Sequence, residues 1–412
     1  MNEYESLKIL VVDDDPFVLK LLAHQLASVG CRAVRTFERA QAALTHIETR
    51  DAAIDMILCD LDMPQMDGVE FVRKLVRTQF TGGLVLVSGE NKRILHAAEQ
   101  LARAHRLRVL GALAKPVSQA DLQRMLDRYL EEPTVPRGVR KSYSADELSQ
   151  ALEHGDLYCE YQPLVEVATG RLVGVETLVR WRHASDGTVY PDQFIGVAEE
   201  HGLIDRLTDL VLTQALQQCR AWRREGLYLK VSVNVSMDNM GTLSFPDTVM
   251  GKVAAAGIDA SSLTLEVTES QLMKDRRSSL DILTRLRLKD IGLSIDDFGT
   301  GHSSLVQLRD VPFDELKIDR SFVHGADHDR SLRAIFNGNV AMAEQLDMRI
   351  VAEGVEDAED WGFLCATGCS LAQGYFIGRP MRPEALASWL KSWQTRYRVL
   401  AAELPDDDRE PR

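Results

Sequence analysis

The chain of 412 residues is long enough for two or three domains, each with its own hydrophobic core. Its composition, 45% hydrophobic and 27% charged, is ordinary for a soluble globular protein, and no apolar stretch is long enough to span a bilayer. The formal net charge of -14 argues against broad nonspecific binding of nucleic acid. The six cysteines form no CxxC pair and no secretory signal is visible, so we expect a cytoplasmic protein with buried free thiols.

The first 130 residues alternate short apolar runs with amphipathic helical stretches. The apolar runs cover residues 9–12, 33–37, 56–59, 84–87 and 109–113. Helical periodicity is visible at 17–29 and 119–130. Five such alternations predict an α/β domain with a doubly wound parallel sheet over residues 1–130. Residues 131–142 contain two prolines, a glycine and no hydrophobic period, and are predicted to form a linker.

The alternation resumes at residue 143 for about 250 residues, the usual size of a β/α barrel. Candidate strands cover residues 158–163, 172–181, 229–236, 263–268, 292–298, 315–319, 349–353 and 370–376. Eight strands with intervening helices predict a TIM-like barrel over residues 143–395. A charged C-terminal tail follows at 396–412.

Polar side chains follow the predicted strands of the first domain. They are Asp13, Asp14, Asp15, Asp60, Ser88 and Lys115. Because the carboxyl ends of parallel strands converge on one crevice, these groups can meet in space. Neighbouring carboxylates repel unless a cation lies between them, and Mg²⁺ suits oxygen ligands. A carboxylate beside such an ion can attack a phosphoryl donor and form an acyl phosphate. For single residues a structural role is an alternative, since Asp15-Pro16 is typical of a helix start.

Three segments of this domain together resemble response-regulator receiver domains. They are Leu10-Val-Val-Asp-Asp-Asp-Pro16, Asp60-Leu-Asp-Met-Pro-Gln-Met-Asp-Gly68 and Lys115-Pro116. The resemblance implies a flavodoxin/CheY-like fold, a sensor histidine kinase as partner and Asp60 as the phosphoacceptor. It also implies Asp13 and Asp14 as Mg²⁺ ligands and Ser88 with Lys115 as phosphate sensors. One position departs from the family: Ala112 stands where many receivers carry a switching aromatic residue.

In the predicted barrel, polar and apolar residues alternate along the strands. In residues 231–236 three valines alternate with Ser232, Asn234 and Ser236. Since barrel strands pack branched residues against the outer helices, the polar positions are predicted to face the inside of the barrel. They also come late in each strand, at the end of the barrel where enzymes of this fold have their active sites. The polar residues so placed are Glu176, Asn234, Glu266, Asp296, Asp297, Lys317 and Glu353. Any one acid could instead be a loop cap or a surface charge.

This set of oxygen ligands predicts a metal centre. Buried acids in that number need compensating charge, and oxygen ligands without His or Cys favour Mg²⁺ or Mn²⁺ over zinc. Asp297 could reach a second ion if the strand ends between Asp296 and Asp297. Two ions roughly 4 Å apart are the usual arrangement for phosphodiester hydrolysis.

Seven segments resemble the EAL phosphodiesterase family. They are Glu176-Thr-Leu178-Val-Arg180, Asn234-Val-Ser236, Glu266-Val-Thr-Glu269, Asp296-Asp-Phe-Gly-Thr-Gly301, Lys317-Ile-Asp319, Glu353-Gly-Val-Glu356 and Gln373-Gly-Tyr375. The receiver-first order resembles RocR-type response regulators. The family hydrolyses cyclic di-GMP to linear pGpG, so the resemblance implies that activity here, and a homodimer or tetramer formed through the EAL domain, without DNA or a membrane as partner.

The resemblance also implies residue roles. Glu176, Asn234, Glu266 and Asp296 would ligate one metal, and Asp296 with Asp297 the second. Glu353 would be the general base or water-orienting carboxylate, and Lys317 would position the attacking water. The implied substrate-pocket positions are Gln162, Leu178, Arg180, Asp319, Glu356 and Gln373. Glu269 would anchor the loop after Asp297. Two residues depart from the family: Thr177 replaces the alanine of the motif, and His302 stands where a tyrosine is common.

Two other functions are weighed against an active phosphodiesterase. The first is a catalytically silent sensor or scaffold that binds cyclic di-GMP; such degenerate members lose metal ligands or the general base, which this chain retains. The second is a DNA-binding response regulator, which the net charge and the lack of a basic recognition helix disfavour. The direction in which phosphorylation changes activity is left open by the sequence.

Overall fold

The computed structural model describes residues 3–49, 54–78, 80–89, 92–105, 107–131, 143–236, 238–239, 242–268, 276–299 and 305–403. The chain divides into two compact units, Met1–Arg140 and Lys141–Arg412. Within the described ranges, none of the helices combines the length and the apolarity that crossing a bilayer requires.

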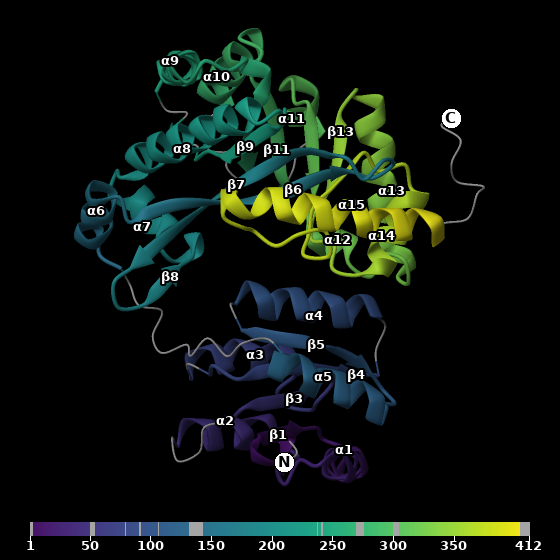
Figure 1. Cartoon of the computed structure of the whole chain (residues 1–412). Helices are drawn as coiled ribbons and strands as arrows, with labels where there is room; N and C mark the ends of the chain where they lie inside the picture. Colours follow the sequence, from purple (N-terminus) through teal and green to yellow (C-terminus); the bar gives the residue numbers. More distant parts are fainter. Residues whose placement is uncertain are drawn as a thin grey trace. The chain divides into compact units, whose positions relative to one another are not determined.

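The N-terminal unit is a five-stranded parallel sheet in the order β2-β1-β3-β4-β5 (Figure 1). The strands are β1 (Lys8–Val12), β2 (Ala33–Phe37), β3 (Met56–Asp60), β4 (Gly83–Ser88) and β5 (Arg108–Ala114). The helices are α1 (Pro16–Val29), α2 (Ala40–Glu48), α3 (Gly68–Arg77), α4 (Lys92–Ala104) and α5 (Gln119–Glu131), after a short 3-10 turn at Glu3–Ser6. Separate hydrophobic clusters cover the two faces of the sheet, so its central strands read as continuous apolar runs. The predicted doubly wound fold is confirmed.

Local chemistry explains where the helices of this unit begin. The Asp15 side chain accepts a hydrogen bond from the Phe17 N–H, and Pro16 occupies the first helical position of α1. The Asp67 side chain caps α3 in the same way. Asp15 and Asp67 therefore serve as helix caps, while Asp13 and Asp60 lie at the ends of buried strands.

The C-terminal unit is a closed barrel. Its strands are β6 (Leu157–Glu166), β7 (Leu172–His183), β9 (Lys230–Asn234), β10 (Leu263–Thr268), β11 (Gly292–Phe298), β12 (Glu315–Ile318), β13 (Arg349–Ala352) and β14 (Leu371–Ala372). They follow the order β6-β14-β13-β12-β11-β10-β9-β7, and pairing of β6 with β7 closes the ring. A short strand, β8 (Gly187–Val189), extends the outer end of β7. The predicted TIM-like barrel is confirmed.

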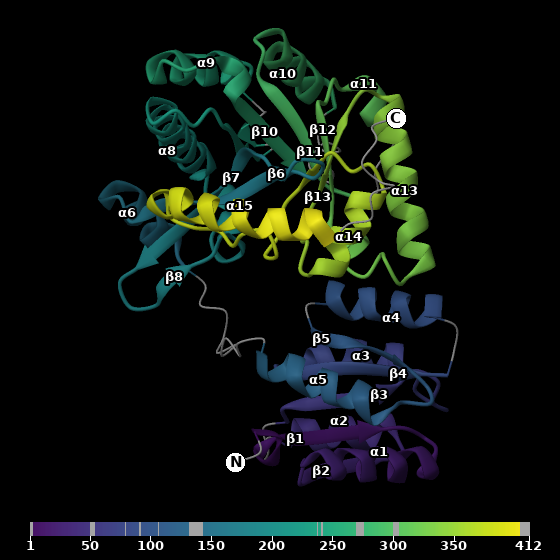
Figure 2. The same ribbon diagram turned by 45° about the vertical axis from the view of Figure 1, so that its right-hand side comes forward.

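Helices surround these strands in both views (Figures 1 and 2). They are α6 (Ala145–His154), α7 (Ile195–Glu200), α8 (Ile204–Arg224), α9 (Phe245–Ala256), α10 (Arg276–Leu288), α11 (Leu305–Asp310), α12 (Arg320–Val323), α13 (Arg330–Gln345), α14 (Ala358–Ala366) and α15 (Leu386–Glu403), with 3-10 turns at Pro191–Gln193, Ala260–Ser262 and Pro383–Ala385. Val231 and Val233 are fully buried in the hydrophobic core, as their parity predicts.

The first strand departs from strict β/α alternation. β6 runs antiparallel to both of its neighbours, because a tight turn rather than a helix connects it to β7. Gly170 in that turn has φ of 64°, and a Cβ there would collide with the ring of Tyr397. As a result, the beginning of β6 lies at the same end of the barrel as the carboxyl ends of the other strands.

Candidate active site

The centre of the barrel site is a buried lysine surrounded by carboxylates. Lys317, near the end of β12, is 2% exposed. Its Nζ lies 2.7 Å from Glu353 Oε1, 3.0 Å from Glu266 Oε2 and 3.1 Å from Asp296 Oδ1, and 3.6 Å from Glu176 Oε2. Three of these acids lie on the strands β7, β10 and β11, and the fourth, Glu353, directly follows β13. The acids that the alternation of polar and apolar residues placed inside the barrel therefore all lie around the ammonium group of Lys317.

Glu176 joins this cluster to a set of side-chain amides. Asn234 donates to Glu176 Oε1 at 2.9 Å, which leaves the Asn234 carbonyl oxygen available to another partner. Gln373 Nε2 donates to Glu176 Oε2 at 2.5 Å and to Gln162 Oε1 at 3.0 Å. Gln162 donates in turn to the Gly378 carbonyl at 3.1 Å. Gln373 thereby holds the second carboxylate oxygen of Glu176, and Gln162 holds Gln373.

The backbone of β11 brings its two adjacent aspartates to one side. The register of β11 against β12 shifts between Ile295 and Phe298, and Asp297 has φ of 55°. The Asp297 N–H donates to Asp296 Oδ1 at 3.0 Å. Carboxylate oxygens of Asp296, Asp297 and Glu353 lie within 4.8 Å of one another. A left-handed residue is costly outside glycine, so this turn concentrates strain at the acid cluster.

The site buries several carboxylates around a single ammonium group, and the pKa values of three of these carboxylates are raised as a result. Burial, reinforced by the other carboxylates, raises the pKa of Glu266 and that of Glu353 well above their ordinary value. Burial and the neighbouring Asp296 raise the pKa of Asp297 to about 6. Burial alone would lower the pKa of Lys317, but the surrounding carboxylates outweigh it and raise that pKa. One ammonium therefore does not balance the acids around it.

This donor set fits divalent metal ions. Every group around Lys317 that can bind a cation offers oxygen, and Mg²⁺ and Mn²⁺ prefer oxygen ligands. The three mutually close carboxylates Asp296, Asp297 and Glu353 can hold an ion, and Glu176, Glu266 and Asn234 adjoin them. Cations at this place would relieve the repulsion that raises the carboxylate pKa values.

The other predicted pocket positions lie around this centre. Arg180, on β7 beyond Glu176, donates to Glu160 Oε2 at 2.9 Å, and Leu178 pairs with Glu160 across the hairpin. Asp319 caps α12 through the Ser321 N–H and adds to the negative charge that raises the pKa of Asp297. Glu356 forms an ion pair with Arg320 at 2.7 Å. Glu269 and His302 lie outside the described residues.

The N-terminal unit holds a second acid cluster. Carboxylate oxygens of Asp13, Asp14 and Asp60 lie within 4.8 Å of one another. Lys115 Nζ lies 2.7 Å from Asp13 Oδ2 and 2.9 Å from Asp60 Oδ2, and the Lys115 N–H donates to the Ser88 carbonyl. Burial raises the pKa of Asp60, against the opposing effect of Lys115. The second carboxylate oxygen of Asp60, Oδ1, is buried, and the backbone of Asp62 lies close enough to lower the pKa of Asp60 slightly.

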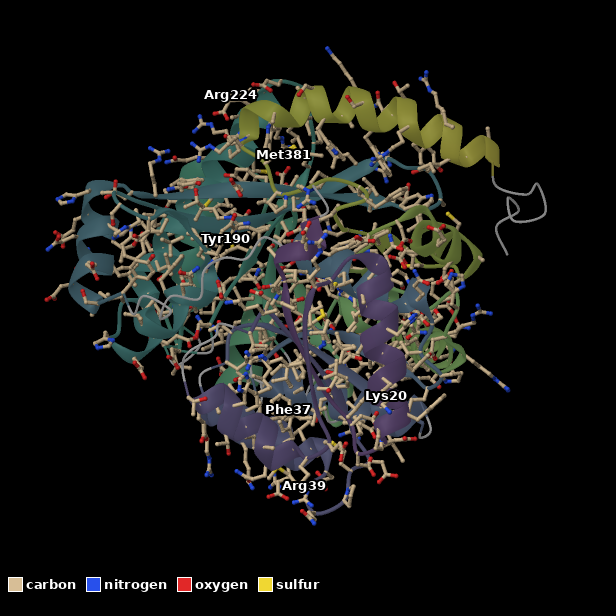
Figure 3. The ribbon with its side chains drawn as sticks, turned by 90° about the horizontal axis from the view of Figure 1, so that it is seen from below. Lys20, Phe37, Arg39, Tyr190, Arg224 and Met381 are labelled. Atoms are coloured by element: carbon tan, nitrogen blue, oxygen red, sulfur yellow. The ribbon has the colours of Figure 1, made fainter. Side chains whose placement is uncertain are left out.

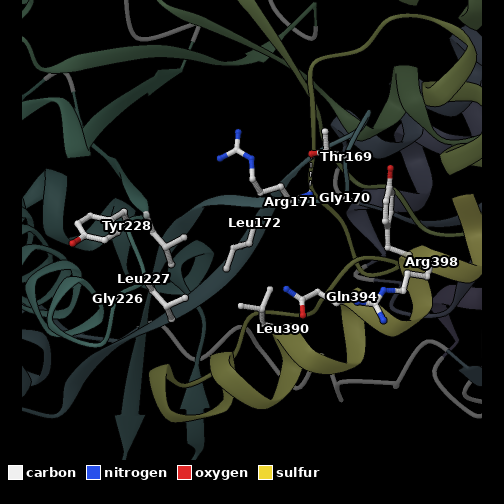
Figure 4. A pocket seen from close by; sticks show the side chains of 12 residues that line it. Thr169, Gly170, Arg171, Leu172, Gly226, Leu227, Tyr228, Leu390, Gln394 and Arg398 are labelled. Carbon is white, nitrogen blue, oxygen red and sulfur yellow. Dashed lines mark hydrogen bonds between the residues drawn. The ribbon is translucent and has the colours of Figure 1, made fainter. Parts of the chain in front are cut away.

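A pocket of about 490 Å³ lies elsewhere on the barrel (Figure 4). It is lined by the β6–β7 turn, by the residues that precede β9 and by α15. Both Leu172 and Leu229 lie at the amino-terminal ends of their strands, so this pocket is at the end of the barrel away from the acids. This pocket is therefore distinct from the candidate active site.

Comparisons with known proteins agree with these two sites. The EAL domain family matches residues 145–380, and the response regulator receiver domain family matches residues 9–127. This chain belongs to the EAL domain family. Both families typically use divalent metal ions. The EAL domain thus contains the Lys317 cluster, and the receiver domain contains the Asp60 cluster.

Individual relatives cover one or both domains. The cyclic di-GMP phosphodiesterase RocR of Pseudomonas aeruginosa is 31% identical over 379 residues, covering 91% of this chain and 96% of RocR. The cyclic di-GMP phosphodiesterase NbdA of the same species is 40% identical over 65% of this chain, which spans only 34% of NbdA. The structure of the PaMucR phosphodiesterase in complex with c-di-GMP is 42% identical, with a TM-score of 0.56, covering 58% of this chain and 98% of that one.

The structure also reveals polar groups that the sequence did not single out. Asp360 is fully buried and accepts hydrogen bonds from the Glu356 and Gly325 N–H groups and from His324. Asp360 therefore ties the loop after β13 to the loop after β12. Its position in the first turn of α14 is typical of a surface acid, and no sequence pattern distinguishes it.

Proposed function

We propose that this chain hydrolyses cyclic di-GMP to linear pGpG in its EAL domain, and that phosphorylation of Asp60 by a sensor histidine kinase regulates the reaction. The observation that carries the proposal is the complete set of four carboxylates within 3.6 Å of Lys317 Nζ, in a member of the EAL family. Two relatives named as cyclic di-GMP phosphodiesterases support the same substrate.

In this mechanism Glu176, Asn234, Glu266, Asp296 and Asp297 would hold the two divalent ions. Mg²⁺ or Mn²⁺ would act as a Lewis acid that promotes ionisation of the attacking water and offsets the charge of the phosphodiester. Glu353 accepts the proton of that water as general base, from its place beside Asp296 and Asp297. Lys317 donates to the attacking oxygen and offsets the negative charge that develops on the phosphoryl oxygens. As the new bond to phosphorus forms, the bond to the 3′ oxygen breaks, and this oxygen takes up a proton from solvent to give linear pGpG.

The remaining pocket residues orient the substrate. The buried amides of Gln162 and Gln373 are held by each other and by Glu176, so their orientation is set before the substrate binds. Arg180 is positioned by Glu160 and offers its remaining N–H groups to a phosphate or a base. Asp319 and Glu356 supply carboxylates that can accept hydrogen bonds from guanine.

The deciding experiment is chromatographic separation of nucleotides after the purified chain is incubated with cyclic di-GMP and Mg²⁺ or Mn²⁺. We expect pGpG to appear and to vanish when a chelator is added. Tight nucleotide binding without product would instead identify a sensor or scaffold, and the absence of both would exclude cyclic di-GMP as the ligand.

A further inference from the structure

One face of the β6–β7 hairpin leads from the acid cluster outward. Gln162 pairs with Glu176, Glu160 with Leu178 and Tyr158 with Arg180. Since successive side chains of a strand point to opposite faces, all of these even-numbered residues share one face. The hairpin therefore extends the wall of the active site beyond the barrel ring.

The opposite face of the hairpin belongs to the core. Leu157, Cys159 and Tyr161 are buried, and the Tyr161 ring packs edge-on against Trp222 of α8 at 4.9 Å. Gln214 of α8 donates to the Leu157 carbonyl. Because α8 covers this face, the even-numbered face is the one that remains on the side of the acids.

The outer end of the even-numbered face carries two tyrosines and two arginines. We name Tyr158, Arg182, Tyr190 and Arg382 the outer arginine–tyrosine cluster. The guanidinium carbon of Arg382 lies 4.2 Å from the centre of the Tyr158 ring, and that of Arg182 lies 5.3 Å from it. The Tyr158 hydroxyl is 3.3 Å from Thr188 Oγ1 on β8. Two cations and a hydroxyl contact therefore hold one ring in place.

Arg180 connects this cluster to the inner site. Its guanidinium carbon lies 5.1 Å from the centre of the Tyr190 ring, while its Nε donates to Glu160. Arg180 is buried, whereas Tyr190 is 51% exposed. The exposed ring of Tyr190 contributes little to the hydrophobic core, but it presents a flat aromatic surface on which a ligand can stack.

Separate segments of the chain bring the cluster together. Tyr158 lies four residues from Gln162 along β6, a distance of about 13 Å in a strand. Arg382 follows Met381, which forms an antiparallel bridge with Tyr161. Arg182 and Tyr190 flank β8 at the end of the hairpin. Tyr190 and Met381 are labelled in Figure 3.

We propose that the outer arginine–tyrosine cluster binds the nucleotide of the substrate that lies away from the Lys317 centre, by stacking its base and pairing with its phosphate. This inference rests on the proposed hydrolysis of cyclic di-GMP. A dinucleotide with one phosphate at the acids must place its other nucleotide along a wall of the mouth. Aromatic rings and guanidinium planes stack on bases, and arginine pairs with phosphate oxygens. The cluster therefore sets affinity and dinucleotide specificity, not the chemical step.

The test compares a dinucleotide with a small phosphodiester. The variants are the double substitution Arg182→Ala/Arg382→Ala and the single substitution Tyr190→Ala, assayed on cyclic di-GMP and on bis(p-nitrophenyl) phosphate. We expect KM for cyclic di-GMP to rise about tenfold, the loss of one stacked base, with kcat changing less than twofold. The ratio of kcat/KM for cyclic di-GMP to that for the small diester should fall about tenfold. Tyr190→Phe should restore the ratio.

Tyr228→Ala is the matched control. Tyr228 is 74% exposed, and the guanidinium carbon of Arg223 lies 5.5 Å from the centre of its ring, as in the cluster. Tyr228 precedes β9, however, and so lies at the other end of the barrel. This variant should match wild type on both substrates. Equal loss on both substrates in the cluster variants would show a structural role and overturn the proposal, as would an unchanged KM. A changed oligomeric state with unchanged KM would assign the face to contacts between copies of the chain.

Binding measurements separate this proposal from the proposed function. The same variants are titrated with cyclic di-GMP in Ca²⁺ without turnover, where we expect Kd to rise about tenfold. If wild type binds cyclic di-GMP without hydrolysing it, the proposed catalysis fails while this comparison still decides the role of the cluster. If wild type does not bind cyclic di-GMP at all, both proposals fail.

Discussion

The two domains each place a lysine among carboxylates at the carboxyl ends of parallel strands, but they bury it to different degrees. In the receiver domain the Lys115 side chain is 24% exposed and contacts Asp13 and Asp60. In the EAL domain Lys317 is 2% exposed and contacts four carboxylates. The ends of parallel strands thus carry one lysine that water can reach and another that is an internal counter-charge.

Burial decides what each lysine contributes to stability. A partly exposed ion pair is screened by water and contributes little, whereas a buried ammonium compensates charges that have lost their solvation. We therefore expect Lys317 to contribute more to the stability of its domain than Lys115 does, in addition to the roles proposed for the two lysines. The predictions below test this difference.

The first prediction concerns Asp60. Asp60→Asn should abolish phosphoryl incorporation from a small donor such as acetyl phosphate, because the amide cannot form an acyl phosphate. Incorporation is measured by intact mass or by a phosphate-affinity gel. Asp62→Asn, two residues away and exposed, is the matched control and should incorporate phosphate normally. Phosphorylation that persists in Asp60→Asn would place the acceptor elsewhere.

The second prediction concerns Glu353. Glu353→Gln should lower kcat for cyclic di-GMP about 10³-fold, the typical contribution of a general base, while the fold is retained. The rate is measured as pGpG formed, and thermal unfolding checks the fold. Glu359→Gln, on the exposed side of α14, should leave the rate unchanged. Activity near that of wild type in Glu353→Gln would reject the assigned role.

The third prediction compares the two lysines directly. Lys317→Met should lower the free energy of unfolding of the EAL domain by about 3–5 kcal/mol in a chelator, because it leaves buried carboxylates uncompensated. Lys115→Met should cost the receiver domain less than this, because water reaches the 24% exposed Lys115 side chain, although Asp13 and Asp60 are themselves buried. Urea unfolding of both variants measures the difference, and added Mg²⁺ should recover part of the Lys317→Met loss. Equal losses at the two sites would show that burial does not distinguish them.

The fourth prediction extends the comparison to a more exposed cluster. The hydrogen bond from His324 to Asp360 raises the pKa of His324, and the negative charges of Glu356 and Asp357 add to the effect. A raised folded-state pKa gives stability that is complete below about pH 6.5 and is lost as the pH rises through the folded-state value. Since the side chain is 41% exposed, His324→Gln should cost less than about 1 kcal/mol at pH 5.5 and nothing at pH 9. Urea unfolding at both pH values checks this; a pH-independent difference would contradict it.

The sequence predicted most of the fold because the signals are local. The apolar runs at 9–12, 56–59 and 84–87 correspond to strands buried on both faces, whereas the run at 33–37 forms the edge strand β2, which is largely exposed. Polar parity placed Glu266, Asp296 and Lys317 on the inside of the barrel. Parity carries no information on strand direction, so the antiparallel β6 was not predicted. The strand predicted at 370–376 is regular only at Leu371–Ala372, since Gly374 and the residues after it turn around Val355.

The geometry that joins distant residues lay beyond sequence reasoning. Gln373 and Gln162 meet across 211 positions of the chain, and no pattern specifies that contact. The left-handed backbone of Asp297 depends on the register shift of β11, which the surrounding strands determine. The sequence did assign Lys317 to the active site, but its second role as counter-charge depends on the burial that the structure reveals.

The reversed direction of β6 has a consequence for communication along the chain. Because β6 is antiparallel to its neighbours, the polypeptide enters the barrel at the catalytic mouth rather than at the opposite end. Only five positions separate Leu157, where the strand starts, from Gln162, whose amide contacts Gln373. Helix α6 is therefore joined through a single strand to Gln162, which contacts Gln373, the residue that donates to Glu176.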